Sequence, residues 1–235
     1  MRDYFIFGDV NSSDYGLIVT GVENTESAKR KTKRIVVPGR SGELIQEDGS
    51  YENATQKYRV SIVNDYEKNY PAWLNRAISL PAYQRLEDSI HPEEFRMAAF
   101  TGPTKPKTTG GNKSGSFVIE FDCQPQRWLK DGEIALRIAS GTKLFNAWQP
   151  AKPLIHITGV GKGTLAVGSS TVDIEDIKGS MTIDSENQNV YAGAENRNNS
   201  VVVTGGFPVL KSGETMVNYS GGIETIEIIP RWWKL

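Results

Sequence analysis

Few side chains in this sequence have the residue types and the spacing that catalysis requires. Glu175 with Asp176, and Asp184 with Glu186, are carboxylate pairs of the kind that hydrolyse glycosidic bonds. Adjacent residues on a strand point to opposite faces of the sheet, and acidic residues on strands are usually solvated. The carboxylate pairs are therefore weak candidates for a glycosidase site.

The histidines and the cysteine offer no stronger candidate for catalysis. His91 lies in a polar turn, His156 lies in an expected strand, and no serine or cysteine nucleophile motif accompanies either of them. One cysteine and two distant histidines do not provide the ligands of a transition-metal site. The sequence therefore predicts no enzyme, no metal and no cofactor.

A glycine-rich stretch, GVGKGTLAVG at residues 159–168, has some of the features of a phosphate-binding loop. A P-loop needs Ser or Thr directly after its lysine and a helix beyond it, because the helix N-terminus faces the phosphate. Here Gly163 follows Lys162, and the next residues have a strand pattern. We predict a glycine-rich hairpin turn.

Composition excludes further classes of protein. The chain has 235 residues, with 27 basic against 28 acidic side chains, whereas nucleic-acid binders usually show a basic excess. A single cysteine excludes an internal disulfide, so the fold must be held by packing. The first residues contain no apolar run of signal-peptide or membrane length. We therefore expect synthesis in the cytoplasm, no membrane insertion and no nucleic-acid binding.

Turn residues divide the chain into many short β-branched runs, several of which alternate apolar and polar residues as half-buried strands do. Only residues 66–81 predict a helix, with Pro71 in its first turn and Pro81 at its end. Apolar residues recur there at helical spacing, at Trp73, Leu74, Ala77 and Ile78. So little helix predicts a mainly β protein of sandwich or barrel type. A change of composition between residues 124 and 150 indicates two domains.

One turn, in RIVVPGRSGEL at residues 34–44, has more special residues than a plain hairpin needs. Pro38 fixes one dihedral, and Gly39 and Gly42 permit positive φ on either side of Arg40. Arg40 would then be presented for a bidentate contact with a carboxylate in the hairpin or on a neighbouring chain. An ordinary solvated arginine and one exposed to a lumen are the alternatives.

Large aromatic residues are the other conspicuous group. Trp148, Trp232 and Trp233 are candidates either for packing at a core or interface or for stacking on sugars. The strand before the last two tryptophans, IETIEII, would place Ile223 and Ile229 on one face and Ile226 and Ile228 on the other. We therefore expect this strand to be largely buried and Trp232 and Trp233 to be structural.

Taken in order, the motifs resemble those of distal tail proteins of long-tailed, siphovirus-type bacteriophages. The first half carries the resemblance in YFIFGDVNSSDYGLIV, IVVPGRSGELIQEDGSYEN and SFVIEFDCQPQRW, and the second half in NAWQPAKPLIHITGVGKGTLAVG and the final PRWWKL. The resemblance covers nearly the whole chain, and the hairpin motif is its most specific part. Ser41 departs from it, since family hairpins often have Asp after the arginine.

The resemblance implies a virion structural protein at the tail tip, with no enzymatic activity. It implies an N-terminal ring-forming domain at residues 1–130, of β-sandwich or barrel type with one helix, and a galectin-like β-sandwich at residues 145–235. The chain would form a homohexameric ring, the baseplate hub. It would join the tail tube protein to tail-associated, tail fibre and receptor-binding proteins. The alternative is a carbohydrate-binding, lectin-like module that acts in host attachment.

Overall fold

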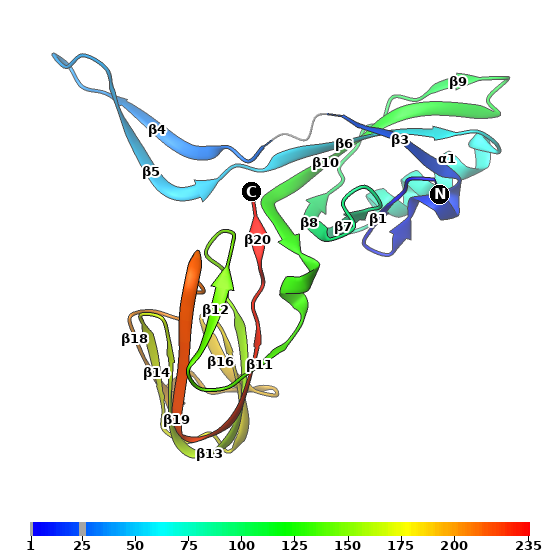
Figure 1. The fold of residues 1–235 in the computed structure, drawn as a ribbon. Coiled ribbons are helices and arrows are strands. Elements are labelled where there is room, and N and C mark those ends of the chain that lie inside the picture. Colours follow the sequence, from blue (N-terminus) through cyan, green and yellow to red (C-terminus); the bar gives the residue numbers. More distant parts are fainter. Residues whose placement is uncertain (1, 24–26) are drawn as a thin grey trace. The chain divides into compact units, whose positions relative to one another are not determined.

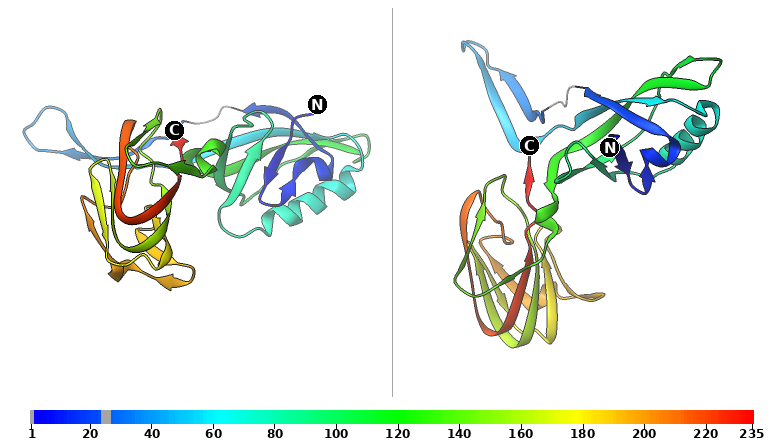
Figure 2. Two further views of the ribbon diagram at one scale, coloured as in Figure 1. Left: turned by 60° about the horizontal axis from the view of Figure 1, so that its bottom comes forward. Right: turned by 45° about the vertical axis from the view of Figure 1, so that its right-hand side comes forward.

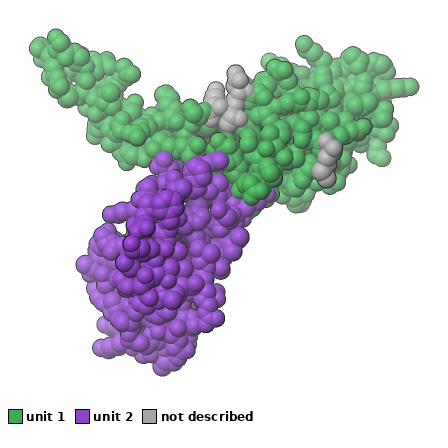
Figure 3. Space-filling model, viewed as in Figure 1, with its two compact units in different colours: residues 1–127, 235 green, residues 128–234 purple. Residues whose placement is uncertain are grey.

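The computed structural model describes residues 2–23 and 27–235, and it divides into two compact units. Unit 1 comprises residues 1–127 with Leu235, and unit 2 comprises Trp128–Lys234 (Figure 3). Strands dominate both units, as Figures 1 and 2 show. The mainly β, two-domain fold predicted from the sequence is confirmed.

Unit 1 is a β-barrel that one helix packs against. Its barrel strands follow the order β2-β1-β7-β8-β10-β6-β3, and an isolated bridge between Asp3 and Val19 joins the start of β1 to β3 and closes the path. The elements of the barrel are β1 (Phe5–Phe7), β2 (Val10–Asn11), η1 (Ser12–Tyr15), β3 (Leu17–Glu23), β6 (Ala54–Ile62), α1 (Tyr66–Ile78), β7 (Gln84–Asp88), β8 (Glu94–Ala99), β9 (Lys107–Thr109) and β10 (Ser114–Leu129). A separate two-stranded sheet consists of β4 (Arg30–Val36) and β5 (Glu43–Tyr51).

Aromatic rings fill the barrel and attach the helix to it. Phe5 stacks on Tyr58 with centroids 5.2 Å apart, and Trp73 of α1 lies 5.4 Å from Phe100 and 5.8 Å from Phe117. Aromatic pairs at these separations contribute about 0.5–1.5 kcal/mol beyond the area they bury. The barrel core therefore holds without a disulfide, and the buried cysteine, Cys123, is a free thiol.

The predicted helix exists, but it begins earlier relative to Pro71 than the sequence suggested. α1 starts at Tyr66, so Pro71 lies inside the helix in its second turn. The backbone carbonyl of Asp65 accepts hydrogen bonds from the amides of Lys68 and Asn69, which establishes the first turn before the proline. Asp65 has a left-handed conformation there, a start that propensity rules do not anticipate.

Unit 2 is a β-sandwich built around two long strands, β13 (Leu154–Val167) and β19 (Gly213–Ile229), which pair along most of their length. The first half of β13 pairs with residues 179–184 and its second half with residues 170–174, and one apolar cluster forms the core of the unit. The remaining elements are η2 (Lys130–Glu133), β11 (Leu136–Ile138), β12 (Thr142–Asn146), β14 (Ser170–Ile174), β15 (Gly179–Asp184), β16 (Asn189–Ala192), β17 (Glu195–Asn196), η3 (Asn198–Ser200), β18 (Val201–Thr204) and β20 (Trp233–Lys234).

Two sequence-based expectations for these long strands are wrong. The glycines at 159–163 lie within β13, where the register shifts, and the hairpin turn comes only at Gly168. In β19, Thr225 pairs with Thr158 and Ile223 with Gly159, so Glu224 is an extra, bulged residue. The bulge turns Ile223 to the same face as Ile226 and Ile228, and all three are buried in one core.

Candidate interaction site

The stretch singled out in the sequence forms the end of the arm, the name used here for β4, β5 and the turn between them. The amide of Arg40 donates a hydrogen bond to the carbonyl of Val37 over 3.2 Å. With Pro38 second and Gly39 third at φ +79°, this is the residue pattern of a type II turn. Gly42 has φ +82° where the chain enters β5. A Cβ at either glycine would meet no atom within 4 Å, so both are needed for conformation and not for space.

Arg40 is exposed to solvent in this turn. Within the described part of the chain, its side chain makes no hydrogen bond and no ion pair. The internal carboxylate contact considered from the sequence is therefore not formed in the single chain.

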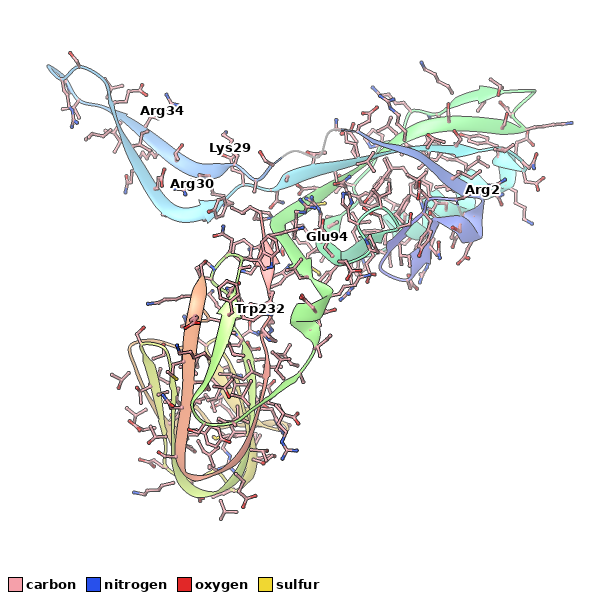
Figure 4. All side chains as sticks on the ribbon, in the orientation of Figure 1. Arg2, Lys29, Arg30, Arg34, Glu94 and Trp232 are labelled. Atoms are coloured by element: carbon pink, nitrogen blue, oxygen red, sulfur yellow. The ribbon has the colours of Figure 1, made fainter. Side chains whose placement is uncertain are left out.

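Ion pairs link the two strands of the arm. Arg30 contacts Glu47 at 3.0 Å and Arg34 contacts Glu43 at 3.3 Å, and Figure 4 labels both arginines. Such exposed pairs contribute about 0.2–1 kcal/mol each, which is too little to hold a free ribbon together. In the register of the two strands, Ile35 lies opposite Leu44 and Arg34 opposite Ile45.

Apolar side chains lie on both faces of the arm. Ile35 and Leu44 share one face, whereas Val36 and Ile45 share the other, where they are 72% and 62% exposed. An isolated two-stranded hairpin is at best marginally stable in water, and a covering surface would stabilise it. The arm therefore has the composition of an element that another protein surface covers on both sides.

The sequence pointed to the turn but not to the whole arm. Two adjacent apolar residues on each strand, Ile35 with Val36 and Leu44 with Ile45, were a detectable signal, because adjacent positions face opposite ways. In the C-terminal stretch IETIEII, apolar residues on both faces led to the expectation of a strand buried by its own chain.

Trp148, Trp232 and Trp233, the three candidate tryptophans, all belong to unit 2. Two of them have clear structural contacts. Trp232 packs on the sandwich core, and its carbonyl accepts a hydrogen bond from the amide of Leu129 over 2.9 Å (Figure 4). The indole of Trp233 donates to the carbonyl of Pro150 over 3.0 Å. Trp148 is 43% exposed, and the Lys234 ammonium lies 5.5 Å from its ring centroid. Only Trp148 has much surface left for a ligand.

The histidines weighed as catalytic candidates have local hydrogen-bond partners. Nδ1 of His91 lies 3.1 Å from Asp88, and Nδ1 of the exposed His156 lies 3.1 Å from the Thr182 hydroxyl. Across residues 2–23 and 27–235, no group of three or more His, Cys, Asp and Glu side chains is arranged to hold a metal ion. The same residues include no helix with the length and apolar character needed to cross a membrane.

Asp184, one of the carboxylate candidates, has a structural role. It is buried at the end of β15, where it accepts hydrogen bonds from Arg231 at 2.7 Å and from the Asn187 amide at 2.8 Å. Burial by itself would raise its pKa, but the bonds from Arg231 and Asn187 outweigh burial and hold the pKa of this carboxyl below its ordinary value. A glycosidase acid needs the opposite, a raised pKa.

Replacing Asp184 with asparagine should destabilise unit 2 at pH 7 by about 1.5–3 kcal/mol, the typical contribution of a hydrogen bond to a charged group. The folded-state pKa is lowered, so this stability is present above the unfolded-state pKa and is lost as the pH falls through the folded value. Urea denaturation at pH 7 and at acidic pH would measure both effects. Glu186→Gln, which removes an exposed carboxylate two residues away, is the control and should cost little. Equal losses from the two variants would contradict this account.

Comparison with known proteins agrees with this fold. The chain matches the crystal structure of the SPP1 Dit (gp 19.1) protein, described as a paradigm of the hub adsorption apparatus in phages that infect Gram-positive bacteria, with a TM-score of 0.81, 11% identity and full coverage of both chains. It also matches a chain of the phage P2 baseplate in its activated conformation with Ca, with a TM-score of 0.50 and 10% identity, over 100% of this chain and 98% of the other. No protein-family model and no curated protein matches the sequence. The resemblance to distal tail proteins is thus confirmed at the level of the fold.

Proposed function

We propose that the chain is a structural subunit of the tail tip of a long-tailed bacteriophage, where copies close into a hexameric ring, the hub of the baseplate. The observation that carries the proposal is the likeness of fold, along the full length of both chains, to a phage hub protein. Fold alone does not transfer function, so the assembly surface needs its own argument.

The arm supports the ring because it suits a contact between copies. A ring is built from one surface meeting a different surface on the next subunit, and a protruding ribbon can serve as the first of these surfaces. Apolar residues on both faces of the arm favour a neighbour that covers it, and Arg40 has its donors free for a carboxylate of that neighbour. Pro38, Gly39 and Gly42 hold the turn in shape. Unit 1, residues 1–127 with Leu235, is then the ring-forming part.

In this proposal, unit 2 is the part available to other virion proteins. Tail-associated, tail fibre and receptor-binding proteins would dock on the hub, and the tail tube protein would adjoin the ring. The location is the tail tip of the virion, after synthesis in the host cytoplasm.

Electron microscopy of the purified chain tests the proposal directly. We expect negative-stain images to show closed rings of one size, and sedimentation velocity to show a single multimer. A chain that stays monomeric at every concentration and salt condition would contradict ring formation.

A carbohydrate-binding module is the second candidate, and the partly exposed Trp148 favours it. Aromatic rings of this kind can stack on sugars, although Lys234 lies near one of its faces. Two results together would favour the lectin function over the hub function. The pure chain would bind host-wall glycans and lose this binding in Trp148→Ala, and the images would show no rings.

A further inference from the structure

β18 differs from the other edge strands of unit 2 because it carries no charged residue. Within the described residues it pairs with β14 and with no other strand, so it is the last strand on its side of the sheet (Figure 1). The other edge strands, β11, β12 and β17, contain Arg137, Lys143 and Glu195. Charges, prolines and bulges normally keep an edge from pairing with another chain. β18 has none of these three features, and residues 198–210 contain no charged side chain.

Val201 and Val203 direct their backbone groups away from β14. In an antiparallel pair, opposite residues alternate between positions that exchange two hydrogen bonds and positions that exchange none. The amide of Glu175 donates to the carbonyl of Ser200 over 2.9 Å, in the same register as the pairing of β14 with β18. Val202 is therefore a bonded position, and the N–H and C=O groups of Val201 and Val203 point to the open edge. No residue of the described ranges, 2–23 and 27–235, forms a hydrogen bond with these four groups.

The chemistry of this edge specifies what can cover it. Only another extended chain matches the spacing of a row of backbone donors and acceptors. The side chains of Val201 and Val203 pack against the core of unit 2, whereas Val202 between them points outward and is 58% exposed. A strand beside this edge would therefore meet backbone groups and one exposed valine, with no charge to satisfy. An uncharged, β-branched strand fits best, and β18 itself is such a strand.

We propose that β18 pairs in antiparallel orientation with β18 of a second copy of the chain. A two-fold arrangement with Val201 opposite Val203 of the second copy gives all four free backbone groups of each strand a partner. Val202 then lies opposite Val202 of the second copy, at a position where Cα atoms are about 4.5 Å apart. Neither strand brings a charge into the contact, so no ion loses its hydration.

This contact is small and separate from the arm. β18 has four residues, far fewer than the roughly 20–30 residues that each side of a standard interface contributes, so the pairing should be weak and depend on concentration. The proposal does not depend on the function proposed above. Rings built by the arm should persist in every β18 variant, so a loss of rings and a loss of this contact are separate results.

Cysteine cross-linking of the full chain tests the register. Under mild oxidation with copper phenanthroline, Val202→Cys should form a disulfide-linked dimer on a non-reducing gel, because the expected Cα separation lies in the disulfide range of about 4.4–6.8 Å. Thr204→Cys is the matched control, since its exposed side chain lies on the same face but would face Ser200 of the second copy. The wild type should form no such dimer, because Cys123 is buried and burial raises the pKa of its thiol to about 12. We expect at least tenfold more dimer from Val202→Cys than from Thr204→Cys.

A charge swap provides an independent test. Val202→Lys and Val202→Glu would each place like charges directly opposite one another, which is unfavourable, whereas an equimolar mixture of the two variants would place opposite charges there. Sedimentation velocity over a concentration series should show weaker association in each variant and recovered association in the mixture. Val160→Lys, at another largely exposed valine of unit 2, should associate as the wild type does. The proposal is overturned if Val202→Cys yields no more dimer than Thr204→Cys, or if neither charged variant weakens association.

Discussion

Replacing Val36 and Ile45 together with aspartate should turn rings into single chains without unfolding either unit. Both side chains lie on one face of the arm and are largely exposed in the single chain, so their replacement removes little internal packing. Burial of each against a neighbour would be worth roughly 1.5–3 kcal/mol, and a buried carboxylate would add a desolvation penalty. Because about 1.4 kcal/mol is a factor of ten, each subunit contact should weaken about a hundredfold or more.

Sedimentation velocity measures the loss of rings, and circular dichroism confirms that the variant remains folded. Val202→Asp is the matched control, because it places the same charge at a largely exposed valine of unit 2, outside the arm. Rings that persist in the arm variant as they do in the control would remove the arm from the assembly mechanism. The ring itself would then need another contact surface.

The sequence predicted the type of the fold well because strand and turn signals are local. Alternating β-branched runs and one proline-bounded helix were enough for a mainly β chain with a single α-helix, and α1 occupies most of the expected range. The closure of the barrel was not predictable in this way. It depends on a bridge between Asp3 and Val19, and no local pattern reports such a pairing.

The candidate site was predicted in part, for a related reason. The residue types predict the shape of the turn, since Pro38 and Gly39 occupy the positions at which a type II turn favours proline and glycine. The exposure of β4 and β5 could not be predicted from the sequence, because the same apolar residues also occur in strands that their own chain buries.

The long strands of unit 2 show where period-two reasoning fails. Alternation gives the face of each residue only if every residue is paired in turn. Glu224 is bulged and breaks this condition. As a result, Ile223 lies on the same face as Ile226, although strict alternation would place the two on opposite faces. The glycines at residues 159–163, which the sequence suggested as a turn, instead lie where the pairing of β13 with β19 is irregular. We call this irregular segment the crossing of β13 and β19. The crossing is therefore the place where a small substitution should have a large effect.

Replacing Gly222 with alanine should destabilise unit 2 strongly, and more than Gly161→Ala. A Cβ at Gly222 would lie 1.8 Å from the carbonyl oxygen of Val160, a backbone atom that can move only if the paired strands separate. Overpacking of a rigid interior typically costs about 1–3 kcal/mol and occasionally more, and here the obstacle is backbone. Both layers of the sandwich depend on this crossing, so we expect a loss at the upper end of that range or beyond it.

Gly161→Ala separates this steric cause from backbone conformation. Gly161 lies in the same bend with φ +77°, but a Cβ there would meet no atom within 4 Å, so its cost should be limited to about 1–2 kcal/mol of left-handed strain. Urea denaturation of the intact chain, followed by tryptophan fluorescence, would rank the two variants. Because a Cβ at Gly222 would press β13 and β19 apart, Gly222→Ala should also lose the amide protection of β13 and β19 in hydrogen exchange. If Gly222→Ala is as stable as Gly161→Ala, the two strands do not approach as closely in solution as the bulged register requires.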